Sequence, residues 1–150
     1  MYDYETSIVI ADKVLALPKQ CWSNSVRALR TCKKQLRGAF YVEGHIEFIP
    51  GLYIQHGWLE LPDGTIVDPT RAFLVCYHGH TPDNRTYYPL LKYTLADLRG
   101  VRYTDLPLGM IELNIWEFER LPEQIQHTFL RGKSLEAYLT GIRECQVVRL

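Results

Sequence analysis

The spacing of hydrophobic residues changes from a helical to a strand period at Gly38, and this change limits the folds open to the chain more than any other feature. From about residue 20 to residue 37, hydrophobic residues recur at spacings of three, four and seven, which is typical of an amphipathic helix. Basic residues gather in the second half of this segment, where they suit the negative end of a helix dipole, and Gly38 suits a left-handed cap. We therefore predict a helix over residues 20–37 that leads directly into strands.

Residues 39–49 alternate between hydrophobic and polar side chains, which indicates a half-buried strand. The polar set includes Glu43 and His45, so we expect these two side chains on a solvated face, with the lining of a substrate groove as the alternative. Gly44 interrupts the pattern and is expected to mark a break or a β-bulge in the strand.

A second alternating segment, residues 52–61, is followed by Asp63-Gly64, which is a strong two-residue turn signal. Residues 65–68 return from this turn, so the two segments predict a tight antiparallel hairpin. Residues 87–93 are expected to form a further strand near the edge of the sheet, because Pro89 has no N–H to donate to a neighbouring strand.

The rest of the chain completes the predicted fold. Residues 76–86 indicate a surface loop, residues 94–100 a short capped helix, and Pro122 and Ser134 suit the starts of two C-terminal helices. No repeat, linker or low-complexity tract divides the chain, and 150 residues is the size of one ordinary domain. We predict a single α+β domain over residues 1–150, with a cysteine-bearing helix packed on an antiparallel sheet.

Charge and cysteine usage narrow the classes of partner and compartment. The chain has 17 basic and 17 acidic residues, and neither sign forms a run, so we expect neither nucleic acid nor a membrane surface as its partner. The N-terminal residues lack the pattern of a signal peptide, and no stretch approaches the roughly 20 apolar residues of a membrane span. The four cysteines are far apart and form no CxxC pair, so we expect free thiols in a reducing cytoplasm.

Cys21 lies at the start of the predicted helix, where it is placed to act as a nucleophile. The unpaired N–H groups of a helix N-terminus carry partial positive charge, which stabilises a thiolate. A neighbouring imidazole can then take the thiol proton, and a third polar group can hold that imidazole in the correct tautomer.

The predicted hairpin supplies both of these groups. If Leu61 pairs with Thr65 across the turn, an antiparallel register with a small bulge brings His56 close to Asp68. Each of the two polar residues projects from an otherwise hydrophobic strand face, where it is sheltered from water. Cys21, His56 and Asp68 are therefore the candidate catalytic residues.

Three stretches, QCWSNS, YVEGHI and IQHGWLELPDGTIVDPT, resemble papain-like cysteine enzymes of the transglutaminase and NlpC/P60 type, in particular small uncharacterised bacterial and phage members. The resemblance covers residues 19–70. It implies a papain-like fold in which Cys21 is the nucleophile, His56 the general base and then general acid, and Asp68 the group that orients His56. The implied activity is hydrolysis or acyl transfer at an amide bond of a peptide or protein substrate, through a thioester and without a cofactor.

The resemblance also implies an oxyanion hole built from the backbone N–H of Cys21 and one further donor. The candidates for that donor or for substrate binding are Gln20, Asn24 and Gln55. The glutamine of papain-type enzymes lies several residues before the cysteine, whereas Gln20 is adjacent to it. Trp58 is expected to pack in the core, or to form a wall of the site that keeps water from the imidazole.

Other interpretations stay open. Cysteine is often buried, so Cys21 could be a core thiol, and Asp68 before a proline could simply cap a turn. A non-enzymatic module on the same fold that binds a peptide is the alternative to an enzyme. Cys76, His78 and His80 are spaced so that they could instead hold a zinc ion.

Overall fold

The computed structural model describes residues 1–49, 52–79 and 85–109. Within these ranges the chain forms three α-helices, one four-stranded antiparallel sheet and a short 3-10 helix, so the predicted α+β class is confirmed. The helices predicted from Pro122 and Ser134 lie outside the described residues. In chain order the elements are α1 (Tyr4–Val14), α2 (Cys21–Thr31), β1 (Phe40–Ile49), β2 (Leu52–Glu60), β3 (Ile66–Val67), α3 (Pro69–His78), β4 (Tyr87–Tyr93) and η1 (Tyr103–Asp105).

The strands follow one another in the sheet in the order β3-β2-β1-β4, and every pair is antiparallel. β2 and β3 form the predicted hairpin, in which the Leu61 N–H donates to the Thr65 carbonyl at 2.8 Å. β4 lies at an edge of the described sheet, as Pro89 indicates. The hairpin prediction succeeded because its signals, the turn and the alternation, are local in the sequence.

Gly44 is a site of irregularity, as predicted, although β1 continues through it. The pairing of β1 with β4 shifts register between Glu43 and Gly44. A Cβ atom at residue 44 would lie 2.2 Å from the Tyr88 carbonyl oxygen and 2.6 Å from the Trp58 ring. Glycine is therefore required here because β4 and the indole approach the backbone too closely for a side chain.

The helices differ more from the prediction. α2 begins at Cys21 as expected but ends at Thr31, and residues 33–38 form turns. Cys32, the C-cap, and Leu36, within the turns, both lie in the core. α1 was not predicted, although Asp3 caps it by accepting a hydrogen bond from the Thr6 N–H at 2.9 Å.

α3 was also not predicted, and it changes the interpretation of two segments. Asp68 is its N-cap and Pro69 its first residue, which is a common start for a helix. The helix continues to His78, so the prediction of a loop beginning at Cys76 is wrong for residues 76–78. At residues 94–100 a short helix was predicted, but the chain forms a turn. Thr94 and Asp97 nevertheless make the expected capping hydrogen bonds.

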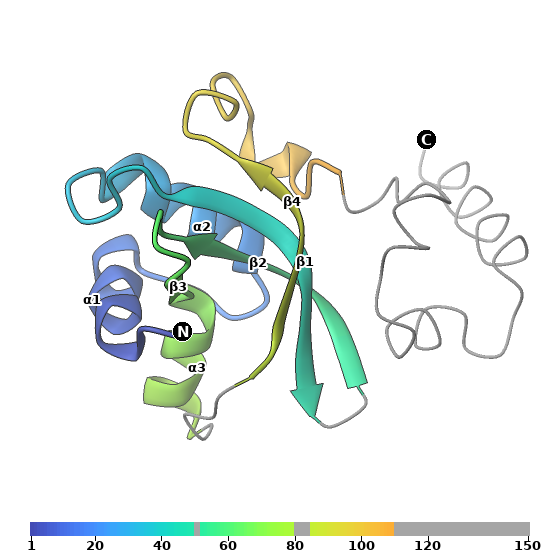
Figure 1. Cartoon of the computed structure of the whole chain (residues 1–150). Helices are drawn as coiled ribbons and strands as arrows, with labels where there is room; N and C mark the ends of the chain where they lie inside the picture. The colour runs from blue at the N-terminus through green and yellow to red at the C-terminus, as the bar shows by residue number, and fades with distance from the viewer. Residues whose placement is uncertain (50–51, 80–84, 110–150) are drawn as a thin grey trace, which may run out of the picture.

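The helices pack against the sheet and against one another. α2 contacts β2 and β1, while α1 lies beside α3 and next to β3 (Figure 1). The backbone before α1 bonds to β3, since the Asp3 N–H donates to the Ile66 carbonyl at 2.9 Å. The hydrophobic core between these elements includes Ile10, Val14, Val26, Leu29, Tyr41, Leu59, Val67 and Leu98.

The prediction of a solvated face on β1 is wrong. Glu43 and His45 are both buried, at 0% and 1% exposure. The Glu43 carboxylate accepts hydrogen bonds from the Tyr41 hydroxyl and from the N–H groups of Leu108 and Gly109, so the chain after η1 covers this face. Burial lowers the pKa of His45 to about 4. The alternation of polar residues was misleading because a buried carboxylate satisfied by hydrogen bonds, as Glu43 is, follows the same pattern.

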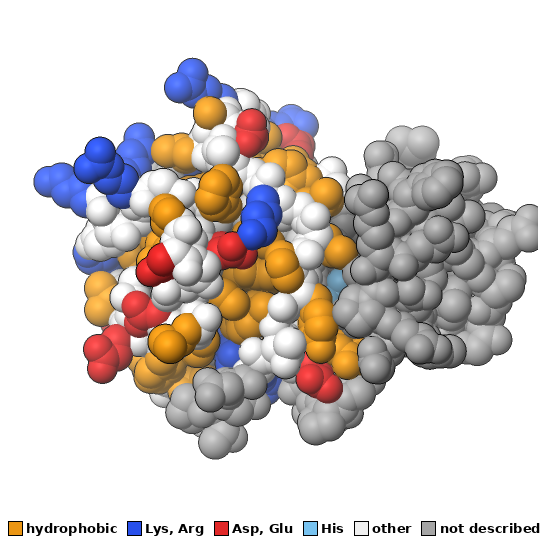
Figure 2. Space-filling model, in the orientation of Figure 1, with side chains coloured by type: hydrophobic (Ala, Val, Ile, Leu, Met, Phe, Trp, Pro, Cys, Tyr) orange, Lys and Arg blue, Asp and Glu red, His pale blue; other side chains and the backbone are white. Residues whose placement is uncertain are grey.

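The surface in the orientation of Figure 1 is mixed in character. Figure 2 shows hydrophobic side chains over much of the middle of this face, with basic side chains mainly at the top and upper left and acidic side chains scattered from the top to the lower edge. Among the described residues, no helix combines the length and the hydrophobicity that crossing a bilayer requires.

Candidate active site

Cys21 is the first residue of α2 and is half-buried. The side chain of its N-cap, Gln20, makes no capping hydrogen bond, and the first turn of the helix contains no acidic residue. The positive end of the helix dipole therefore faces the sulfur without a carboxylate from its own first turn to offset it.

A glycine brings this helix end against the strand that carries His56. The Ser25 hydroxyl donates to the Gly57 carbonyl at 3.0 Å, which docks α2 on β2. A Cβ atom at residue 57 would lie 2.4 Å from Cδ1 of Trp22, so only glycine permits this approach. The role of Gly57 was missed, although a glycine inside a strand pattern is a known sign of close backbone approach.

His56 and Asp68 form the pair that the hairpin register predicted. Nε2 of His56 lies 2.6 Å from Oδ2 of Asp68, and both side chains are buried. Because the carboxylate can only accept, Nε2 carries a proton. Nδ1 is therefore the imidazole nitrogen available for proton exchange with the Cys21 thiol.

The electrostatics of the pair favour its charged form. Burial by itself lowers the pKa of His56, but the charges of Asp68 and Cys21, together with hydrogen bonds to both, raise it well above its ordinary value. Burial raises the pKa of Asp68, but His56 and the hydrogen bonds from Arg71 and Tyr87 hold it below its ordinary value. The arrangement therefore supports an imidazolium beside a carboxylate and a sulfur.

Asp68 performs both of the functions considered for it. Oδ1 accepts from the Arg71 N–H at 3.0 Å and so caps α3, while Oδ2 holds His56. Its own N–H donates to the Ser7 hydroxyl at 3.0 Å, which links it to α1. The turn-capping interpretation and the catalytic one are thus compatible, because each uses a different oxygen.

A tyrosine from the edge strand supports this carboxylate. The Tyr87 hydroxyl donates to Asp68 Oδ2 at 3.0 Å and accepts from the Arg71 guanidinium at 3.3 Å. Its ring lies edge-on to Trp58, with centroids 5.1 Å apart. Tyr87 was not predicted as a site residue, since only the pairing of β4 with β1 brings it here.

Replacing Tyr87 by phenylalanine is expected to lower the free energy of unfolding by about 1.5 to 3 kcal/mol. Without the hydroxyl, the buried Asp68 carboxylate loses a donor that stabilises its charged form, and the Arg71 guanidinium loses an acceptor. Urea unfolding measures the loss. Tyr88→Phe is the matched control, because Tyr88 packs on Tyr53 instead; an equal loss in both variants would contradict a role for Tyr87.

A cavity of about 300 Å³ lies beside the sulfur and the imidazole. Gln55 is among its lining residues, as expected of a substrate contact. Trp58 is fully buried and stacks on His56 with ring centroids 6.3 Å apart, but it is not a lining residue, so it packs in the core behind the imidazole. The residues that line the cavity are Lys19, Cys21, Trp22, Ile46, Ile54, Gln55, His56, Thr70, Arg71, Leu74, Val75 and Arg85.

Two other predicted site residues do not line this cavity. Asn24 is fully buried, and its amide bonds to the Leu17 backbone and the Thr70 hydroxyl, so it holds the loop before α2 instead of binding substrate. Gln20 is exposed and contributes its carbonyl, which accepts from the Asn24 N–H at 2.8 Å. Glu43 and His45 are likewise not lining residues, so their alternative assignment to the substrate groove is wrong.

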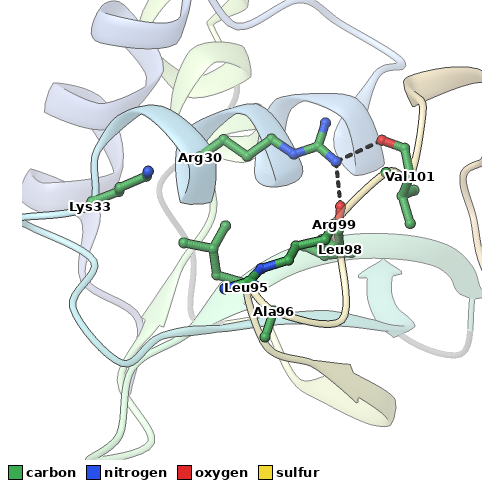
Figure 3. Close-up of a pocket in the computed structure, with 8 residues that line it drawn as sticks. Arg30, Lys33, Leu95, Ala96, Leu98, Arg99 and Val101 are labelled. Carbon is green, nitrogen blue, oxygen red and sulfur yellow. Dashed lines mark hydrogen bonds between the residues drawn. The ribbon is translucent and has the colours of Figure 1, made fainter.

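A larger cavity, about 680 Å³, lies at the opposite end of α2 (Figure 3). Arg30 donates there to the carbonyl oxygens of Leu98 and Val101, both at 2.7 Å, and so holds the turns after β4 against the helix. No cysteine, histidine or carboxylate is among its described lining residues. The smaller cavity is therefore the one equipped for acid-base or nucleophilic chemistry.

The zinc alternative involves residues at the end of α3. Cys76 and His78 lie in its last turn, whereas His80 lies outside the described residues. In the ranges that the structure describes, no group of three or more His, Cys, Asp or Glu side chains could hold a metal ion. The zinc site therefore stays a prediction that depends on His80.

Comparison with known proteins adds no relative: no family model, no curated protein and no solved structure matches this chain. The function must accordingly be inferred from the chemistry of the cavity that Cys21 and His56 share.

Proposed function

We propose that the protein is a cysteine-dependent hydrolase or acyltransferase that acts on an amide bond of a peptide or protein. The observation that carries the proposal is the buried His56–Asp68 pair at 2.6 Å, whose imidazole lines the same cavity as a thiol at a helix N-terminus. We also propose a papain-like core of the transglutaminase or NlpC/P60 type. The order of a helix-borne cysteine, a strand histidine and a carboxylate at the end of the next strand supports that assignment.

The first half of the proposed reaction forms a thioester. The Cys21 thiolate attacks the carbonyl carbon of the substrate, and the backbone N–H of Cys21 donates to the resulting oxyanion. The C–N bond then breaks as Nδ1 of His56 gives its proton to the leaving amine. Asp68 keeps the imidazole in position through Nε2 while the charge of the imidazole changes.

The second half releases the acyl group. Water or an acceptor amine attacks the thioester carbonyl and gives a proton to Nδ1, the C–S bond breaks, and the thiolate–imidazolium pair is restored. Peptide hydrolysis, deamidation and amine transfer differ only in the leaving group and the acceptor, so all three are compatible with the same residues.

An activated ester tests the proposal without knowledge of the natural substrate. Incubation with p-nitrophenyl acetate is expected to release a burst of p-nitrophenolate, at most equal to the amount of protein, and to leave an acetyl group on Cys21. Hydroxylamine should speed the loss of that acetyl group, because it is a better acceptor than water. Peptide mapping by mass spectrometry locates the adduct. Absence of both the burst and the adduct would contradict the enzyme and favour a peptide-binding module.

A further inference from the structure

The cavity beside Cys21 combines two kinds of lining side chain. Trp22, Leu74 and Val75, together with the isoleucines of β1 and β2, make much of its wall hydrophobic. Its charged lining residues other than His56 are all cationic: Lys19, Arg71 and Arg85. No acidic side chain is among the described lining residues. The anions of the site itself, the Asp68 carboxylate and the Cys21 thiolate, are outnumbered by these cations together with the imidazolium of His56, so the field inside the cavity favours a negatively charged guest.

Arg71 and Lys19 contribute to this charge in different ways. Arg71 is 5% exposed, donates to the Tyr87 hydroxyl, and lies over the Tyr2 ring at 4.6 Å from its centroid, so its position is determined by the site's own residues. Lys19 is exposed, and in the described part of the chain it forms no ion pair with a carboxylate. Its ammonium group is therefore available to an incoming ligand.

The backbone at Lys19 is in a conformation that favours glycine. Its φ is +60°, in the left-handed region that residues with a Cβ atom seldom adopt. A glycine would relieve the strain but would remove a positive charge two residues before Cys21. Leu15, the C-cap of α1, has the same conformation outside this cavity, so what distinguishes Lys19 is its positive charge among the lining residues.

We propose that this cavity binds an acyl donor that carries a negative charge next to a hydrophobic portion, and that Lys19 recognises the charge. This inference rests on the proposed function, because it names the class of substrate that Cys21 would attack. Lys19 acts as a specificity residue, which places the charged group of the donor near the sulfur before the thioester forms.

Two alkylating reagents that differ in charge test the proposal. Iodoacetate is an anion and iodoacetamide is neutral, and each reacts with a thiolate by forming an S–C bond and releasing iodide. The ratio of their rates at Cys21 is expected to exceed the same ratio at the exposed Cys76. Lys19→Gln should lower the ratio at Cys21 about threefold to tenfold, as expected for the loss of one nearby charge in a partly shielded site.

Three further variants separate charge from other causes. Lys34→Gln removes the same charge from an exposed turn outside the cavity and should leave the ratio unchanged. Lys19→Arg should keep the ratio. Lys19→Gly, which suits the left-handed backbone, should lower it as much as Lys19→Gln does, because the proposal assigns the effect to the ammonium group.

The outcomes for this inference and for the proposed function are distinct. If Cys21 reacts with iodoacetamide as a nucleophile but its ratio is the same in wild type and Lys19→Gln, the charged donor is ruled out while the enzyme stands. If Cys21 reacts no faster than Cys76 with either reagent, the proposed function itself fails.

Discussion

Replacement of Cys21 by alanine is expected to abolish both the p-nitrophenolate burst and the acetyl adduct, with no residual fraction. Among the described residues that line the cavity, Cys21 is the one cysteine, so it is the thiol expected to form the thioester there. The fold should persist, because Cys21 is half-buried and loss of its sulfur is expected to lower the free energy of unfolding by at most about 1 kcal/mol. Stopped-flow absorbance measures the burst and urea unfolding the stability.

Two other cysteines are the controls for this variant. Cys76→Ala removes an exposed thiol and Cys32→Ala a thiol of the core, and both proteins should keep a full burst. A burst that survives in Cys21→Ala would place the nucleophile elsewhere. A Cys21→Ala protein that fails to fold would instead indicate that this thiol is a structural part of the core.

Asp68→Asn is expected to lower the acylation rate by roughly 10²-fold to 10⁴-fold, as in other triads that lose the orienting carboxylate. The amide does not stabilise an imidazolium as a carboxylate does, and its NH₂ group can hold the imidazole in the wrong tautomer. The rate of the p-nitrophenolate burst measures the loss. Asp63→Asn is the matched control, because it makes the same change of charge in the exposed hairpin turn and Asn-Gly is as good a turn as Asp-Gly.

The same variant should reduce the free energy of unfolding by about 2 to 4 kcal/mol, between the cost of an unsatisfied buried group and that of a broken buried ion pair. The pKa of Asp68 is lowered in the folded protein, so its contribution is complete above its unfolded pKa of about 3.9 and is lost as the pH falls through the folded value. The pKa of His56 is raised, so its contribution is complete below its unfolded pKa of about 6.5 and is lost as the pH rises through the folded value. The loss of stability in Asp68→Asn should therefore be largest between about pH 4 and 6.5, and a loss independent of pH would contradict the ion pair.

The elements that the sequence predicted correctly are those with local signals. The Asp63-Gly64 turn set the hairpin register, and that register brought Asp68, the residue after β3, close enough to β2 for its carboxylate to reach His56. α1 and α3 have equally local signals in Asp3 and Asp68, each an N-cap aspartate. They were missed because an aspartate before a helix and an aspartate in a turn look alike in the sequence.

The features that could not be predicted depend on contacts between distant segments. Tyr87 reaches Asp68 only because β4 pairs with β1, and Gly57 matters only because α2 docks on β2 at that residue. The burial of Glu43 follows from the return of residues 106–109 across β1. Periodicity identifies a strand and its two faces, but it does not show which of them another segment will cover.

The pH dependence of Cys21 alkylation by iodoacetamide, measured with peptide mapping, tests the central claim most directly. We predict that Cys21 of the wild type reacts at about pH 6 nearly as fast as at pH 8, whereas free N-acetylcysteine, with the ordinary thiol pKa of about 8.5, gains rate over this range. In His56→Ala, Cys21 should follow the profile of the free thiol, because the imidazolium that stabilises its thiolate is gone. A wild-type Cys21 that is inert, or that follows the free-thiol profile with His56 in place, would contradict the thiolate–imidazolium pair.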